Sequence, residues 1–313
     1  MKLFKIKILI PILLLFLLAG GLLKSFFVSS SAISQPDLPL YHPQYYLLQR
    51  ALLDTSLKEN RNRILINMER WKAIPKNTGR KYLMVNIADF RMNAIENDSL
   101  ILSLKTIVGK LYRKTPLFHT KMTHIVFNPT WTIPPNILRN DILPLIKKDI
   151  SYLKKRNIRI FQTDKTGKRK QVSADSINWK AVSEKQFPYQ LVQDAGKDNA
   201  LGVVKFMFPN SYHVYMHDTP SKELFEETER TFSSGCIRVS NAIDLATYLL
   251  KNKWDKTKIM NVIKSGKTFT VYLVEPVEVY IEYFTAWVDA DGILQFRKDI
   301  YERDSFPVKI IYQ

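Results

Sequence analysis

The chain has 313 residues, of which 46% are apolar and 12% aromatic, so it can bury a folded core and is not a disordered chain. Its 47 basic and 29 acidic residues give a net charge of +18, which no single tract carries. Such a surface attracts polyanions, namely nucleic acid, anionic lipid or a carboxylate-rich cell wall. Nucleic acid is excluded by the export predicted below and by the lack of zinc-ligand spacing, a glycine-rich phosphate loop or an RNA-binding signature.

Residues 1–34 are predicted to be a signal peptide or a membrane anchor. Three lysines, Lys2, Lys5 and Lys7, precede an uncharged run of sixteen residues, 8–23. A helix of that length spans about 24 Å, less than the roughly 30 Å hydrocarbon core, which favours a cleaved signal. The lack of a clear small-x-small cleavage site favours an anchor instead. Both interpretations predict an exported, periplasmic protein, held at the inner membrane by residues 8–23 if the segment stays uncleaved.

Residues 35–78 are predicted to form a linker and a small helical segment. The first of these residues are proline-rich and are expected to be extended. Apolar residues at helical spacing predict helices over 45–57 and 61–71, and Pro75 and Gly79 end the second helix.

The remaining chain, residues 79–313, is predicted to be one domain built mainly from strands. Runs rich in Ile, Val, Leu and aromatic residues predict strands over 82–87, 90–95, 100–108, 124–133, 202–208, 212–217 and 236–239, with two C-terminal strands beginning at 268 and split at Glu275-Pro276. Helices are expected over 221–227, 241–250 and 255–264. The predicted fold class is mainly β with peripheral helices (α+β), and residues 268–313 form its C-terminal strands.

Residues 136–190 interrupt the series of strands. They begin with a predicted lysine-rich helix over 138–155 and continue through a polar, turn-rich stretch over 163–170 to Trp179. A connection of this length is more often a lid or a binding loop than a plain link between strands. We therefore expect a helical lid over a groove.

The only cysteine, Cys236, has no intramolecular disulfide partner, so its thiol is either buried and inert or free and reactive. His217, nineteen residues earlier, ends a predicted strand, and Cys236 begins another. The two side chains would lie side by side if these strands are neighbours, and Tyr215 and His213 would share the face of His217. A thiol nucleophile needs a base and oxyanion donors, for which the backbone amides of Gly235 and Cys236 are candidates.

Five stretches carry a resemblance to a known family. In chain order they are Phe127 to Pro134, Asn199 to Gly202 leading into Lys205 to Asn210, Met216 to Pro220, Ser233 to Val239, and Tyr283 to Asp289. Together they resemble the L,D-transpeptidases (YkuD-type catalytic domain), the cysteine enzymes that cross-link peptidoglycan, and in particular their large enterobacterial-type branch. The resemblance extends from about residue 63 to the C-terminus and implies a β-sandwich catalytic domain.

The resemblance implies a covalent mechanism. Cys236 would attack the carbonyl before the terminal D-alanine of a tetrapeptide stem, release D-alanine, and pass the acyl group from a thioester to the amine of an acceptor stem, giving a 3→3 cross-link. His217 would be the base, no metal or organic cofactor is implied, and carbapenems should acylate Cys236. The implied partners are peptidoglycan stem peptides, and the implied role is in cell-wall biogenesis and cell shape.

Other residue roles are less direct. Arg238, Tyr215, Ser234 and Trp131 are candidates for substrate binding, and Trp179 is a further candidate for the wall of a groove or for core packing. Many family members have a histidine at the position of Ser234 and an asparagine at the position of Arg238. The serine and the arginine of this chain are instead similar to the large branch. Only the reduced helical segment precedes the catalytic part, with no evident peptidoglycan-binding domain, so the anchor or the +18 charge is a candidate substitute.

Two alternatives use the same residues differently. An L,D-carboxypeptidase or other wall hydrolase would pass the acyl group from Cys236 to water. A non-catalytic wall-binding protein would keep the fold without the reaction.

Overall fold

The computed structural model describes residues 41–76, 78–182 and 187–305. The predicted leader, residues 1–34, and the last part of the predicted C-terminal strands lie outside the described residues. Within those ranges, none of the helices is both long enough and apolar enough to cross a membrane. Contacts divide the chain into two compact units, the second of which begins at Gly79.

The first unit joins the N-terminal helices to a C-terminal segment that begins at Phe284. Its elements are α1 (Pro43–Ala51), η1 (Thr55–Asn60), α2 (Arg61–Lys72), β14 (Ala286–Val288) and β15 (Leu294–Phe296). Trp71 stacks on Phe284 with ring centroids 4.0 Å apart, and the buried Asn67 donates to Thr285 Oγ1 at 2.8 Å. These contacts explain why the segment from Phe284 packs with the helices, whereas the sequence analysis placed it in the strand domain.

The second unit, Gly79–Tyr283, is built on a large mixed sheet, and the mainly β fold class is confirmed. Its strands are β1 (Lys81–Asn86), β2 (Arg91–Glu96), β3 (Ser99–Gly109), β4 (Phe118–Phe127), β9 (Val204–Met207), β10 (Met216–His217), β11 (Thr231–Ser233), β12 (Ile237–Val239) and β13 (Phe269–Glu282). The order is β11-β3-β12-β10-β9-β4-β13-β1-β2, and an additional pairing of β2 with β3 closes the sheet on itself.

Several predicted strand limits differ from the structure. The predicted strand 124–133 is split, because Asn128 adopts a positive φ of 45° and is followed by a proline that cannot donate to a ladder. In contrast, β13 runs through Pro276 without a break, and the missing donor coincides with an irregular pairing between Tyr272 and Val277. The predicted strand 212–217 is reduced to β10, and His213 before it has a φ of 56°.

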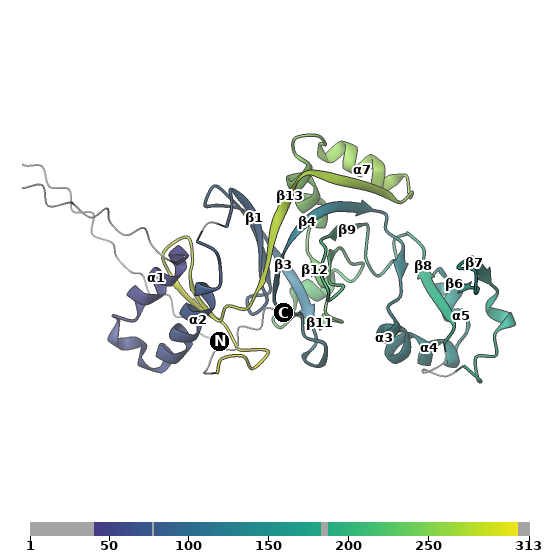
Figure 1. The fold of residues 1–313 in the computed structure, drawn as a ribbon, viewed down its shortest axis with the longest axis horizontal. Helices are drawn as coiled ribbons and strands as arrows, with labels where there is room; N and C mark the ends of the chain where they lie inside the picture. The colour runs from purple at the N-terminus through teal and green to yellow at the C-terminus, as the bar shows by residue number, and fades with distance from the viewer. Residues whose placement is uncertain (1–40, 77, 183–186, 306–313) are drawn as a thin grey trace, which may run out of the picture. The chain divides into compact units, whose positions relative to one another are not determined.

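The insertion (residues 136–190) is not purely helical as the sequence predicts, because it contains strands as well as helices. It contains α3 (Pro135–Ile137), the π-helical turn η3 (Leu138–Ile142), α4 (Leu143–Lys148), α5 (Ser151–Lys155), β6 (Ile158–Thr163), β7 (Arg169–Val172) and the short turn η4 (Ala174–Ser176). Together with β5 (Trp131–Thr132) and β8 (Tyr189–Gln193), its strands form an antiparallel sheet in the order β5-β8-β6-β7. Figure 1 shows these elements gathered at one side of the large sheet.

The insertion has its own apolar core. Buried members include Leu138, Ile146, Leu153 and Ile160, against which Trp179 packs. Because helices and strands of the insertion bury these side chains together, the insertion is a compact layer and not an irregular loop.

Two helices and two 3-10 turns complete the description of this unit: α6 (Ala242–Leu250), α7 (Lys256–Lys264), η2 (Leu111–Arg113) and η5 (Glu223–Glu226). Asp255 caps α7 as predicted, accepting from the Lys258 N–H at 2.7 Å. The Asn128 amide donates to the carbonyls of Val262, Ile263 and Lys267 after β4, which fixes the end of α7 against the large sheet (Figure 1).

Candidate active site

Parallel pairing of β10 with β12 brings the predicted nucleophile and base together. Met216 pairs with Ile237 and His217 with Arg238, and the Ile237 N–H donates to the Tyr215 carbonyl at 3.1 Å. Met216 and Ile237 are fully buried, so alternation places His217 and Arg238 on the opposite face of the sheet. Cys236 directly precedes β12 and does not begin it as predicted. The condition set in the sequence analysis, that the two strands are neighbours, is therefore met.

One cavity of about 550 Å³ gathers the predicted side chains. Its lining includes Cys236, His217, Tyr215, Ser234, Arg238 and Trp131, all of which the sequence analysis selected. His213 and, from the insertion, Arg139 also line it. The cavity therefore lies between the large sheet and the insertion.

The imidazole of His217 is held in one tautomer. Its Nδ1 lies 2.5 Å from the backbone carbonyl oxygen of Asp218, and because a carbonyl only accepts, Nδ1 carries the proton and Nε2 is the free acceptor. Burial, and next the Arg238 guanidinium, lower the pKa of His217 to about 3. The ring is thus neutral near pH 7, the state that a general base requires.

The carbonyl that orients His217 is itself fixed. The Asp218 carboxylate is buried, accepts from the Val203 N–H at 3.0 Å and pairs with Lys222. Gly202, with φ +60°, lies against that carboxylate, and a Cβ at this position would clash with it. The positive φ and the lack of space for a Cβ both require a glycine at position 202. Gly202, the last residue of the stretch from Asn199 that resembles the family, therefore supports the position of Asp218.

The thiol of Cys236 is half-buried and lies among hydrogen-bond donors. Burial raises the pKa of Cys236, while hydrogen bonds from the backbone and hydroxyl of Tyr215 and the charges of Lys205 and Arg238 oppose that rise. The thiol itself faces the His213 carbonyl at 4.0 Å. With a raised thiol pKa and a lowered imidazole pKa, both groups of the resting pair are neutral.

The loop before Cys236 corrects one predicted role. The Gly235 N–H donates to Ser233 Oγ at 3.1 Å, and that hydroxyl donates to the Cys236 carbonyl at 2.5 Å. Gly235 is therefore removed from the predicted pair of oxyanion donors, because its N–H is already used within the loop. The Cys236 N–H has no acceptor among the described residues and remains the candidate donor.

Arg113 links this loop to the insertion. Its Nη1 donates to Ser234 Oγ at 2.8 Å and to Asp141 Oδ2 at 2.5 Å. Ser234 thus lines the cavity and also anchors a contact to η3. The sequence analysis missed Arg113, which lies far from Ser234 along the chain and outside the stretches that resemble the family.

Arg238 and Trp131 lie where two cavities meet. Both residues line the main cavity and also a second one of about 210 Å³. The Arg238 Nε is buried, and its guanidinium forms no hydrogen bond or ion pair with a described residue. Trp179 lies elsewhere: it packs in the core of the insertion and its indole N–H donates to the Ala174 carbonyl at 2.9 Å, so it does not wall the groove.

A second missed residue is Lys205. It belongs to one of the stretches that resemble the family, but a lysine on a predicted strand carries no indication of its surroundings. Its position opposite His217 follows only from the pairing of β9 with β10.

A thiol and a neutral histidine of fixed tautomer share one cavity with a guanidinium that has no partner among the described residues, an arrangement suited to cysteine-dependent acyl transfer. Sequence comparison then gives the family. Residues 80–278 match the model of the YkuD family, described as the L,D-transpeptidase catalytic domain. The chain belongs to this family.

A relative in Haemophilus influenzae, provisionally named an L,D-transpeptidase, is 35% identical over 255 residues, which cover 80% of this chain and 50% of the relative. The chain thus spans about half the length of that relative. An L,D-transpeptidase structure from Mycobacterium smegmatis is 11% identical, covers 65% of this chain and 58% of that chain, and has a TM-score of 0.32. An L,D-transpeptidase in complex with imipenem is 12% identical, covers 64% and 58%, and has a TM-score of 0.31. The family assignment rests on the sequence matches alone.

Proposed function

We propose that the protein is a peptidoglycan L,D-transpeptidase that forms 3→3 cross-links through a thioester on Cys236. The observation that carries the proposal is the placement of Cys236 and His217 by adjacent parallel strands in one cavity, with the imidazole fixed as a neutral base. The match of residues 80–278 to the L,D-transpeptidase catalytic domain supports the choice of reaction.

In the acylation step, the neutral thiol of Cys236 is the proton donor and the neutral imidazole of His217 is the base. Nε2 of His217 takes the thiol proton as the Cys236 sulfur attacks the donor carbonyl, and a C–S bond forms. The imidazolium then gives that proton to the leaving D-alanine nitrogen as the C–N bond breaks. The low pKa of His217 favours this second transfer, because the buried imidazolium is a strong acid.

Transfer reverses the roles. The amine of an acceptor stem attacks the thioester carbonyl, His217 removes a proton from the attacking nitrogen, and the C–S bond breaks with the sulfur recovering a proton. The N–H of Cys236 is the candidate donor to the oxyanion in both steps. Arg238 is suited to bind a stem-peptide carboxylate in a bidentate manner, because its guanidinium has no partner among the described residues.

The insertion is expected to favour transfer of the acyl group to the acceptor amine over hydrolysis of the thioester. It contributes Arg139 and neighbouring residues to the cavity wall and is tied to the catalytic loop through Arg113. Covering the thioester limits the access of water, which competes with the acceptor amine.

We also propose that the protein acts outside the cytoplasm. The support is the lysine-flanked apolar run at residues 8–23, which is typical of a signal peptide or an anchor. Fractionation of cells that express the full chain tests this proposal: recovery in the cytoplasm would contradict it.

The reaction is tested by expressing the full chain and digesting the cell wall for mass spectrometry. We expect 3→3 cross-linked dimers with the wild type and none with Cys236→Ala. Shortened tripeptides without dimers would identify a carboxypeptidase. A carbapenem should add its mass to the wild type and not to Cys236→Ala, and failure to add it would contradict the thioester mechanism.

A further inference from the structure

Lys205 is a half-buried cation on the strand next to the one that carries His217. It lies on β9 directly opposite His217 of β10. No described carboxylate pairs with it, and it is not part of the lining of the 550 Å³ cavity. Its charge is therefore neither neutralised by an ion pair nor presented to a ligand.

Tyr215 stands between Lys205 and the sulfur. Lys205 Nζ lies 4.0 Å from the centroid of the Tyr215 ring, so the ammonium contacts its face. Because Met216 pairs with Ile237, Tyr215 and Cys236 are the next residues along the two neighbouring strands, and both line the cavity. The Tyr215 and His217 rings lie 5.7 Å apart. The Tyr215 ring thus lies between the Lys205 ammonium and the residues of the catalytic pair.

We propose that Lys205 is a positioning residue of the reaction, which stabilises negative charge on the Cys236 sulfur through Tyr215 without contacting substrate. This inference deepens the proposed function and rests on it. An ammonium on the ring face polarises the phenol, which then donates a stronger hydrogen bond to sulfur. The same charge lies opposite His217 and makes the imidazolium a stronger acid toward the leaving amine.

The other charged and titratable groups near the thiol are Arg238 of β12, His217 of β10, His213 and Tyr215 before β10, and Arg139 of the insertion. Arg238 also stabilises the thiolate, but it faces the cavity and would be neutralised by a bound carboxylate. Lys205 keeps its charge when substrate fills the cavity. It is therefore the cation that remains available to the sulfur throughout the reaction.

If Lys205 only supported the packing of the fold, replacing it would lower the stability of the protein. A positioning role predicts that stability is kept. A half-buried ammonium without an anion is costly, because desolvation disfavours its charge and lowers the pKa of Lys205. Methionine has a similar length and no charge. Lys205→Met should therefore leave the thermal midpoint of unfolding unchanged or higher while it lowers the reactivity of the Cys236 thiol. A decrease in both quantities would indicate a packing role.

The test measures the rate of iodoacetamide alkylation against pH, by intact mass of the full chain. Cys236 is the only cysteine, so each adduct reports this thiol. For Lys205→Met we expect the midpoint of the profile to rise by about one pH unit and the rate at pH 7 to fall about tenfold. Lys205→Arg, which keeps the charge, should retain most of the wild-type rate.

A matched control is Lys258→Met. Lys258 Nζ lies 4.6 Å from the Trp254 ring centroid, a similar cation–π contact that the thiol does not share. Its alkylation profile should match the wild type. A second variant, Tyr215→Phe, keeps the ring and removes the hydroxyl, and combining it with Lys205→Met should slow alkylation by less than the product of the two single effects.

Three results would overturn the proposal: a wild-type profile for Lys205→Met, an equal loss for Lys205→Arg, or independent effects in the double variant. Alkylation requires no peptidoglycan, so it is separate from the test of the reaction. A wild type that makes no cross-links but shows the Lys205 effect would contradict the proposed function alone.

Discussion

Hydrogen bonds from backbone groups set the chemical state of both reactive side chains. The Asp218 carbonyl leaves Nε2 of His217 as the acceptor, and the Cys236 thiol faces the backbone carbonyl of His213. Burial acts in opposite directions on the two groups, because it disfavours the imidazolium and the thiolate alike. Cys236 and His217 are consequently both neutral in the resting protein.

The low pKa of His217 makes folding stability depend on pH. Between pH 7 and pH 4.5 the unfolded histidine takes up a proton and the folded one, with a pKa near 3, does not, so stability falls with acidification. We expect His217→Gln to reduce the loss of unfolding free energy over this interval by about 2 to 3 kcal/mol. Urea unfolding of both proteins at the two pH values measures it. Equal losses would show that the imidazole is solvated.

Gly202 provides a second residue-level prediction. Gly202→Ala should displace the Asp218 carboxylate and, with it, the carbonyl that orients His217. A misplacement of this kind is expected to slow carbapenem acylation by about 10- to 100-fold. Gly167→Ala is the matched control, since Gly167 also has a positive φ, +83°, with nothing near its Cβ position. If both variants acylate at the wild-type rate, the carbonyl does not need this support.

At the level of elements, the contact of η3 with the catalytic loop through Arg113 is the feature that couples the insertion to the chemistry. Arg113 donates to both Asp141 and Ser234, so movement of η3 away from the sheet would break the ion pair with Asp141. The sequence analysis selected Ser234 but neither Arg113 nor Asp141, because η3 and the turn after β3 meet only in the folded chain.

Asp141→Asn should weaken that contact. A partly buried ion pair contributes on the order of 1 kcal/mol, so the open population of the insertion should rise about fivefold. The measured outcome is a larger ratio of hydrolysis to amine transfer for the acyl-enzyme. Asp149→Asn, which removes an exposed pair with Lys155 within the insertion, is the control and should leave the ratio unchanged. An unchanged ratio in Asp141→Asn would contradict a covering role.

The strands of the insertion illustrate why part of the fold escaped prediction. β7 consists of Arg169, Lys170, Gln171 and Val172, whose polar side chains give no apolar alternation. Such a strand is specified by pairing with β6 and not by its own pattern. The Cys236 and His217 positions were predictable because their surroundings resemble a family, whereas Lys205 and the engaged Gly235 N–H depend on register and on a local hydroxyl.

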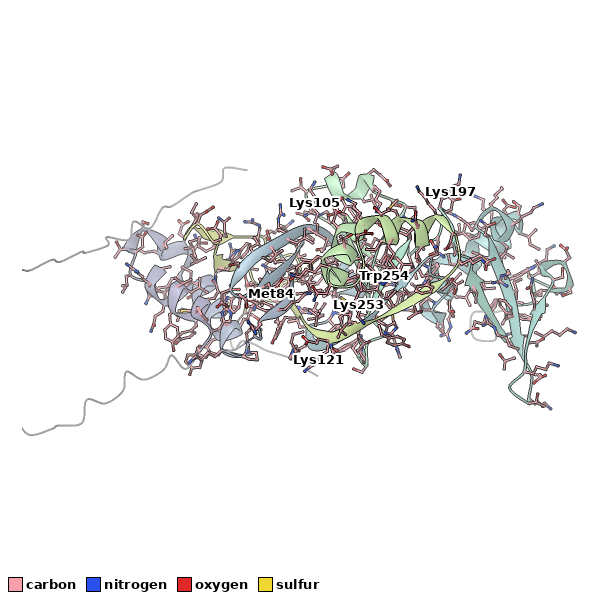
Figure 2. The ribbon with its side chains drawn as sticks, turned by 90° about the horizontal axis from the view of Figure 1, so that it is seen from above. Met84, Lys105, Lys121, Lys197, Lys253 and Trp254 are labelled. Atoms are coloured by element: carbon pink, nitrogen blue, oxygen red, sulfur yellow. The ribbon has the colours of Figure 1, made fainter. Side chains whose placement is uncertain are left out.

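At the scale of the whole molecule, the charge of +18 is distributed as the sequence predicted. The lysines labelled in Figure 2 lie on different segments of the second unit: Lys105 on β3, Lys121 on β4, Lys197 before β9 and Lys253 after α6. A cavity of about 860 Å³ is lined by Lys105, Lys222 and Lys256, each paired with a carboxylate. Positive charge is therefore spread over the surface. Within the catalytic cavity, by contrast, Arg238 has no carboxylate partner among the described residues.

The insertion leaves and rejoins the large sheet at neighbouring points. β5 pairs with β8 through Trp131 and Gln193, and just beyond them Phe127 of β4 pairs with Val204 of β9. The core strands are thus joined to each other independently of what lies between them. The pairing of β4 with β9, which sets Lys205 opposite His217 through the next pair of strands, therefore does not depend on the length of the insertion.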